Sequence, residues 1–213
     1  MGHPLRQICL VIFSVAATTA ACAHPHVWVT IRSEVIYGSN GVVTGIRHAW
    51  TFDDMFSTYA VQGIAHAKTG QFTREELNSL AEVNVTSLKE FDYFTFARID
   101  GRKAAFADPV DYWLEFNDSA LTLHFMLPLK TPVAAKRLQV KIYDPTIFVD
   151  FGPAKGTPVS LVNAPPVCQL QVDVPHKPSA SEQLRLGQLD NNPSDFPISF
   201  GELFANKFVV TCP

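Results

Sequence analysis

The stretch HVWVTIRSEVIYGSNGVVTGIRHAWTFD, residues 26–53, decides the fold. β-branched and aromatic residues alternate on both sides of Ser39-Asn40-Gly41, and an Asn-Gly pair between two such runs is the strongest short-range hairpin signal. The sequence therefore predicts two long antiparallel strands, 26–37 and 42–53. With Asn40 and Gly41 at the two central turn positions, Tyr37 lies opposite Thr44.

This register separates an apolar face from a polar face. The apolar face, which we expect to enter the core, carries Val29, Ile31, Val35, Ile46, Trp50 and Phe52, with Ser33 opposite His48. On the polar face Glu34 lies opposite Arg47, and Trp28 lies opposite Asp53. His24 and His26 continue the polar face past Trp28, so that face ends in histidines.

The rest of the chain adds helices and further strands. Helical spacing runs from 55 to 67, and Thr73 and Glu76 form a capping box before a helix that ends near Phe91. Strand patterns follow at 121–127, 138–143, 159–162, 168–174 and 208–212, with hairpin turns at Asp100-Gly101 and Asn117-Asp118 and a helix at 182–189. We expect an α+β fold with a mainly antiparallel β-sheet, compatible with a two-layer sandwich, and a helical insertion over about 55–91.

Composition limits the class of protein. The chain has 213 residues, 47% of them hydrophobic, which suffices for one well-buried domain. Its net charge of −3 lacks the positive excess that nucleic-acid binding demands. The sequence contains no dinucleotide-binding fingerprint, P-loop, G-x-S-x-G or H-E-x-x-H motif. We therefore expect neither a nucleic-acid partner nor a dinucleotide cofactor.

The first residues have the pattern of a secretory signal peptide. Arg6 precedes an apolar stretch from 8 to 17, and Ala21-Cys22-Ala23 has the A-x-A form of a cleavage site. Residues 1–23 are then removed, and residues 24–213 form a single periplasmic domain that begins at His24. The alternative is a lipoprotein that begins at a lipidated Cys22.

Cleavage after Ala23 also determines which cysteines remain in the mature chain. It removes Cys9 and Cys22 and leaves Cys168 and Cys212 in an oxidising compartment. The sequence predicts a disulfide between these two residues, which stabilises the fold by about 4 kcal/mol in the chain-entropy model.

The new N-terminus forms a candidate metal site. His24 offers its α-amine and its imidazole, and His26 lies on the same side two residues later at strand spacing. Pro25 removes the backbone N–H that an amino-terminal copper chelate must deprotonate. Asp53, diagonal to His26, or the neighbouring Asp54 completes the set. Such ligands suit Zn, Ni, Co or Cu, whereas a frayed polar terminus is the simpler alternative.

The other candidate residues have structural alternatives. We interpret His48 as a core histidine bonded to Ser33, with a place in the outer shell of the metal site as the alternative. Asp144 is expected to cap a turn, or else to serve with Asp150 as an outer-shell partner. His124 is interpreted as a solvated strand residue, and His66 and His176 as surface residues.

Four segments resemble a known family. They are residues 24–27 (HPHV), 50–57 (WTFDDMFS), 143–146 (YDPT) and 204–206 (FAN). These segments resemble a bacterial family of secreted proteins of unknown function, usually described as the periplasmic component of an uncharacterised ABC-type transport system. The resemblance implies a periplasmic protein associated with nickel, cobalt or other metal transport. Family members commonly carry an acidic, calcium-like loop where this chain has 65–69, so a calcium role is not carried over.

Three functions follow from these observations. The first is a periplasmic transition-metal-binding protein that works with a membrane metal transporter or permease. The second is a metal-free interaction module that uses the aromatic surface around Trp28 and Phe56. The third is a copper redox enzyme built on the N-terminal histidine, which requires His48 or His124 as a further ligand.

Overall fold

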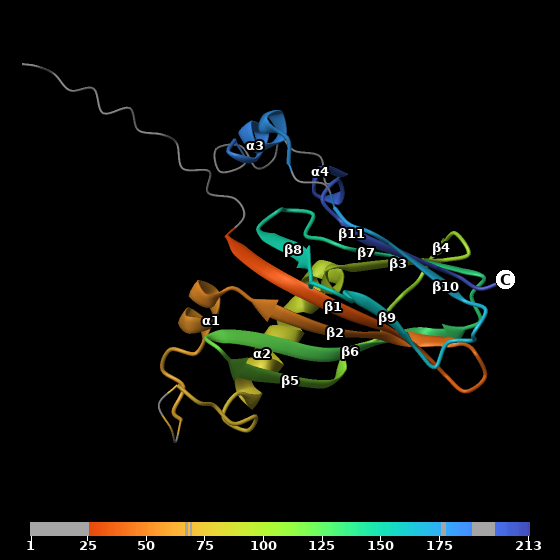
Figure 1. Cartoon of the computed structure of the whole chain (residues 1–213). Helices are drawn as coiled ribbons and strands as arrows, with labels where there is room; N and C mark the ends of the chain where they lie inside the picture. The colour runs from red at the N-terminus through yellow and green to blue at the C-terminus, as the bar shows by residue number, and fades with distance from the viewer. Residues whose placement is uncertain (1–25, 67, 69, 176–177, 189–198) are drawn as a thin grey trace, which may run out of the picture.

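Two β-sheets make up most of the computed structural model, which describes residues 26–66, 68, 70–175, 178–188 and 199–213 (Figure 1). The first sheet has the order β5-β6-β2-β1-β8, and β9 pairs with the far half of β1. Its strands are β1 (Val27–Tyr37), β2 (Val43–Phe52), β5 (Val110–Asn117), β6 (Ala120–Val133), β8 (Val149–Pro153) and β9 (Val159–Val162). Most pairings in this sheet are antiparallel, but β8 and β9 run parallel to β1.

The second sheet has the order β10-β11-β7-β3-β4 and is antiparallel throughout its described pairings. Its strands are β3 (Thr95–Ile99), β4 (Arg102–Lys103), β7 (Arg137–Ile142), β10 (Gln169–Asp173) and β11 (Asn206–Thr211). Buried side chains from both sheets, such as Val35 and Val140, belong to one core. The predicted α+β class with mainly antiparallel sheets is confirmed.

The first hairpin has the predicted register along most of its length. Pairing runs without a shift from Val29–Phe52 to Ile36–Gly45, and then Tyr37 pairs with Val43. The prediction that Tyr37 pairs with Thr44 is wrong, because the turn is centred on Ser39-Asn40, with Gly41 N–H donating to the Gly38 carbonyl at 2.9 Å. Gly41 takes the positive φ of 75° that this turn requires, and a bulge absorbs the extra residue.

The two faces of the hairpin also follow the prediction. Ile31, Ile46 and Trp50 are buried on one face. On the other, Arg47 forms a 2.7 Å ion pair with Glu34. The outer face of the first sheet is therefore polar, and it leads toward His26 at its end.

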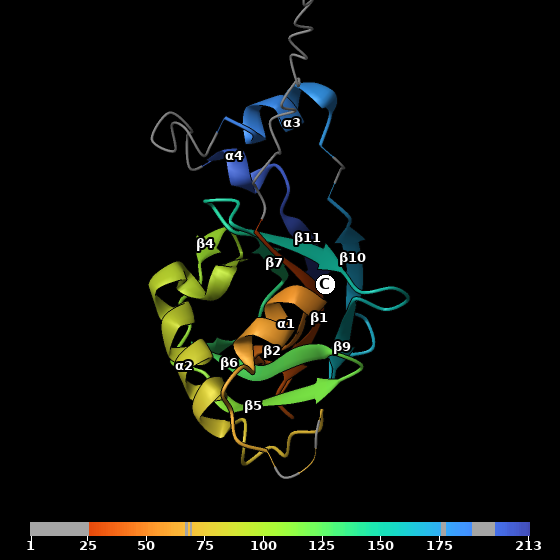
Figure 2. The same ribbon diagram turned by 90° about the vertical axis from the view of Figure 1, so that its left-hand side faces the viewer.

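The insertion after the hairpin is helical, as predicted, but its helices are shorter than expected. It consists of α1 (Asp54–Ala60), α2 (Asn78–Leu88) and the 3-10 helix η1 (Lys89–Phe94). Thr73 and Glu76 form the predicted reciprocal capping bonds at 2.7 and 3.2 Å, although the regular helix begins only at Asn78. Figures 1 and 2 show α2 beside β5, where it buries Ala81 and Val85.

The two later hairpin turns test the predicted turn positions. Asp100 and Gly101 have φ values of 48° and 83°, so this turn is confirmed. In the turn between β5 and β6 the positive-φ residues are Asp118 and Ser119, one position later than the predicted Asn117-Asp118. Both turns need φ above zero at two central residues, which Asp and Gly tolerate better than most residues.

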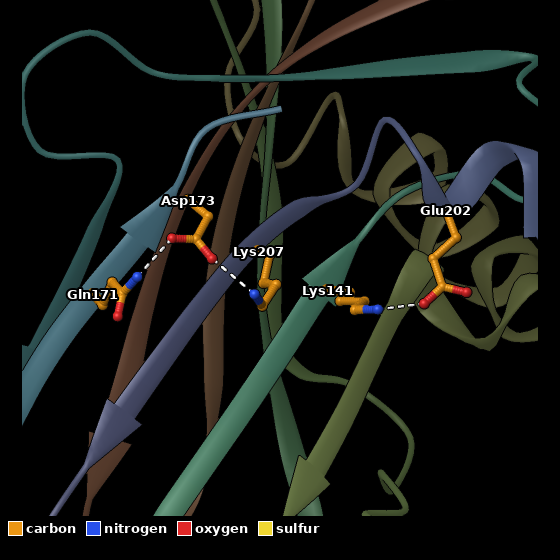
Figure 3. Close-up of polar contacts among 5 residues, drawn as sticks. All are labelled: Lys141, Gln171, Asp173, Glu202 and Lys207. Carbon is orange, nitrogen blue, oxygen red and sulfur yellow. Dashed lines mark hydrogen bonds and ion pairs between the residues drawn. The ribbon is translucent and has the colours of Figure 1, made fainter. Parts of the chain in front are cut away.

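The last part of the chain carries two short helices at one end of the sheets, α3 (Ala180–Leu186) and α4 (Ser199–Glu202) (Figures 1 and 2). The predicted helix 182–189 corresponds to α3, which is capped by Ser179 and ends earlier. Leu186 and Phe200 pack with Ile147 in a second, small hydrophobic cluster. An ion pair between Glu202 and Lys141 ties α4 to β7 (Figure 3).

A disulfide joins Cys168 and Cys212, as predicted. It links the residue before β10 to the residue after β11, so the edge strand of the second sheet is covalently attached to its neighbour.

Several sequence expectations lie outside the described residues, namely those for the signal peptide, His24 and His176. In the part of the chain that the structure describes, no helix has the length and apolar character needed to cross a membrane.

Candidate functional site

His26 lies at the start of β1, on the exposed face of the first sheet. Its backbone N–H donates to the Phe148 carbonyl at 2.9 Å, and its ring lies 4.7 Å from the Phe148 ring. Two residues further along β1, Trp28 lies opposite Asp150 of β8 in the parallel register. The side chains of Trp28 and Phe148 are about half exposed. The end of the polar face therefore presents an imidazole between exposed aromatic rings.

Asp53 lies beside this end of β1, as the register predicts, but its carboxylate already binds the backbone. The backbone N–H of Trp28 donates to Asp53 Oδ2 at 3.0 Å, and the N–H of Phe56 donates to Oδ1 at 2.9 Å. The second bond is the N-cap of α1. Asp54, the next residue, is exposed in the first turn of α1. Asp53 thus fixes the backbone around the site, and Asp54 is the carboxylate with greater access to solvent.

Replacing Asp53 by Ala is expected to lower the free energy of unfolding by about 2 kcal/mol, because a helix cap and a charge-assisted bond to β1 are lost together. Replacing Asp54 by Ala should change it by about 0.5 kcal/mol or less, since this exposed residue lies in the first turn of a short helix. Urea denaturation of the two variants measures both values. Equal losses in the two variants would show that the cap does not stabilise the fold.

His48 lies on the opposite, core-facing side of the same sheet. Its Nδ1 is 3.0 Å from Ser33 Oγ and its Nε2 is 3.5 Å from Thr95 Oγ1, and the side chain is fully buried. Burial lowers the pKa of His48 to about 3, so the ring is neutral at physiological pH. The interpretation as a core histidine bonded to Ser33 is confirmed. The structure does not bring His48 to His26, so His48 does not reach an outer shell there.

Asp144 caps the turn between β7 and β8. Its Oδ1 accepts the Thr146 backbone N–H at 2.8 Å and the Thr146 hydroxyl at 2.7 Å, while Oδ2 accepts the Val149 N–H at 3.0 Å. These bonds occupy the buried carboxylate, as expected for a turn cap. The same turn holds Ile147 at a φ of 60°, a conformation that β-branched residues rarely adopt.

Asp150 is the carboxylate whose surroundings point to a ligand. It makes no hydrogen bond or ion pair with any other residue that the structure describes, and it lines a cavity of about 330 Å³. Although Asp150 is exposed, desolvation by the surrounding chain raises the pKa of its carboxyl. The cavity walls are mainly apolar and include Ile147, Phe151, Pro153, Val174, Leu186 and Phe204.

The other described histidines have local partners of their own. His124 Nε2 lies 3.0 Å from Glu115 Oε1, and its ring stacks on Trp113 at 4.4 Å. His66 is exposed, with Nδ1 2.9 Å from the Ile64 carbonyl. Among the described residues, no group of three or more His, Cys, Asp or Glu side chains is placed to hold a metal ion. A metal site at His26 therefore depends on His24.

The fold and the site define a two-sheet α+β domain with an exposed histidine at the start of its first strand. The chain belongs to the family described as "Protein of unknown function (DUF1007)", whose profile matches residues 9–212. It is also similar to the "Uncharacterized 15.5 kDa protein in trpE 3'region" of Spirochaeta aurantia, with 33% identity over 93 residues. That match covers 43% of this chain and 66% of the relative, so the chain spans just under two thirds of that protein's length.

The cavity is the feature that the sequence did not indicate. Its walls come from the turn after β7, from β8, from the segment after β10 and from α3 and α4, which are distant in sequence. Two segments singled out for their resemblance, 143–146 and 204–206, contribute Tyr143, Asp144 and Phe204 to it. The presence of both segments in one sequence was the available signal for this cavity. It did not show that the two segments lie next to each other in the fold.

Proposed function

We propose that this chain is a periplasmic transition-metal-binding protein that captures Zn, Ni, Co or Cu through His24-Pro25-His26 and works with a membrane metal transporter or permease. One observation carries the proposal: the exposed ring of His26 is held at the start of β1 by a backbone bond and a ring contact, both to Phe148. An imidazole directly after the proposed mature N-terminus is thus oriented by the fold instead of belonging to a frayed end.

The remaining donors follow from the sequence around this ring. Cleavage after Ala23 supplies the α-amine and the imidazole of His24, which lie two residues from His26. Asp54 is the proposed carboxylate, because both oxygens of Asp53 accept backbone N–H groups. Nitrogen donors with one carboxylate fit divalent first-row metals better than Mg or Ca. In this proposal the fold positions the His26 ring, and the new N-terminus at His24 supplies most of the metal-binding atoms.

Titration of the exported protein with Zn²⁺, Ni²⁺, Co²⁺ and Cu²⁺ tests this proposal. His26→Ala should weaken binding of the preferred metal by about 100-fold or more, because mutation of an outer-shell partner alone typically costs about 10- to 100-fold. Asp54→Ala should weaken it by about tenfold. His66→Ala is the matched control, because His66 is also an exposed histidine but lies in a separate loop. Equal affinities of the wild type and His26→Ala would refute the proposed site.

A partner-docking surface is the second candidate function, and exposed apolar side chains favour it. Trp28 and Phe148 flank His26, while Met55 and Tyr59 on α1 are 70% and 73% exposed. Phe56 instead packs against the Phe52 ring at 4.7 Å, so we place this surface around Trp28. Clusters of exposed apolar side chains commonly mark interaction sites.

Trp28→Ala should abolish transporter binding and leave metal affinity unchanged if the surface serves the metal function. In a metal-free interaction module, His26→Ala would instead retain full partner binding. The copper enzyme gains no support, because His48 and His124, its required further ligands, bind elsewhere.

A further inference from the structure

We propose that the cavity between β8 and the helices α3 and α4 binds a small organic cation, with an apolar body inside the cavity and an amine beside Asp150. This site lies next to the proposed metal site, because Asp150 pairs with Trp28 two residues from His26, but its ligand binds without any metal ion.

The cavity has the size and lining of a small-molecule site. Its volume of about 330 Å³ lies at the lower end of the range for ligand pockets. An apolar cavity of about 150 Å³ suffices for benzene, so this one has room for a ligand of roughly ten non-hydrogen atoms. Phe151 and Pro153 form one wall, and Leu186 and Phe204 form another. Such walls favour an aliphatic or aromatic body.

The walls are fixed by specific contacts on several sides. The Lys141–Glu202 ion pair holds α4 against β7, and Lys207 Nζ binds Asp173 Oδ2 at 2.8 Å next to the Val174 wall (Figure 3). Gly201 of α4 packs so closely on the β7–β8 turn that an added Cβ would lie 2.5 Å from the Asp144 carbonyl oxygen. The walls of this partly open cavity are thus held in place by packed elements.

The negative charge of Asp150 favours a cationic ligand in this cavity. Asp150 has no partner among the described residues, whereas Lys141 and Lys207 on the neighbouring strands are paired with Glu202 and Asp173. Arg185 of α3 lies over the Phe200 ring at 4.6 Å. A carboxylate beside apolar walls loses part of its hydration even where it stays exposed, and a bound ammonium group restores the lost interaction. Tyr143 also lines the cavity.

Three eight-carbon probes with different head groups test the proposal: n-octylamine, 1-octanol and octanoate. We would measure their binding to the metal-free protein by calorimetry or NMR titration in the presence of a chelator. The proposal predicts saturable binding of octylamine at least tenfold tighter than that of octanol, and no measurable binding of octanoate. Tenfold is the order expected for one charge-assisted hydrogen bond.

Two variants separate the charge from the cavity. Asp150→Asn should reduce octylamine affinity to that of octanol and leave octanol binding unchanged. Gly152→Phe should weaken binding of both, because Gly152 lines the cavity and an added Cβ meets no other atom within 4 Å, which leaves room for a larger side chain beside the ligand. Circular dichroism and the melting temperature confirm folding of each variant.

The metal variants keep this inference distinct from the proposed function. His26→Ala should bind octylamine like the wild type, even where it loses metal. Octylamine that binds no tighter than octanoate, or that binds Asp150→Asn as well as the wild type, would overturn the cation site. Absence of binding by all three probes would overturn the cavity as a ligand site.

Discussion

Lowering the pH from 7.5 to 5 is expected to reduce the free energy of unfolding by about 2 kcal/mol through His48 alone. Burial lowers the pKa of His48 from 6.5 to about 3 in the folded protein. Below pH 6.5 the unfolded chain therefore binds a proton that the folded chain rejects, and stability falls with pH until the folded ring titrates near pH 3. Over the whole window the loss is on the order of 5 kcal/mol.

His48→Gln is the variant that isolates this effect, because Gln keeps hydrogen-bonding capacity toward Ser33 and does not titrate. Urea denaturation at pH 7.5 and pH 5 should show a loss in the wild type that is about 2 kcal/mol larger than in the variant. The carboxylates of Asp108 and Asp173 have pKa values lowered below 3.8 by partners that include Lys89 and Lys207, so their contributions are lost at lower pH. Identical pH dependence in both proteins would contradict a neutral, buried His48.

Removing the disulfide is expected to lower the free energy of unfolding by about 4 kcal/mol, since the bond closes a long loop in the unfolded chain. Cys168 and Cys212 are separated by 44 residues, and the loop between them contains α3, α4 and the segment that lines the cavity. The double variant Cys168→Ser with Cys212→Ser, compared with the oxidised wild type by urea denaturation, measures this loss. A change below about 1 kcal/mol would mean that the unfolded chain is already compact around this loop.

The sequence predicts the first hairpin well because its signals are local. Alternation identifies the core face, and the Ser33–His48 pair follows directly from the register. The turn itself deviates by one position because Gly41 is better used at the left-handed position after Ser39-Asn40 than inside a two-residue turn. Element boundaries are the least reliable part of such a prediction, and an Asn-Gly pair can occupy either of two adjacent turn positions.

The parallel neighbours of β1 could not be predicted. Val27 pairs with Val149 and Ser33 with Val159, more than a hundred residues away, and no local pattern reports such pairing. These strands also determine what surrounds the candidate site. Phe148, directly before β8, contacts the His26 ring, and Asp150 of β8 lies opposite Trp28. The sequence predicted the position of Asp53 but not its role, because that role depends on which backbone N–H groups its oxygens meet.

The measurement that tests the central claim most directly is the intact mass and metal content of protein exported to and purified from the periplasm, beside a His24→Ala variant cleaved at the same bond. Our account predicts a mature chain that begins at His24 and carries one metal ion, which the variant loses. A chain that begins at a lipidated Cys22, or one that begins at His24 and binds no metal, would contradict it.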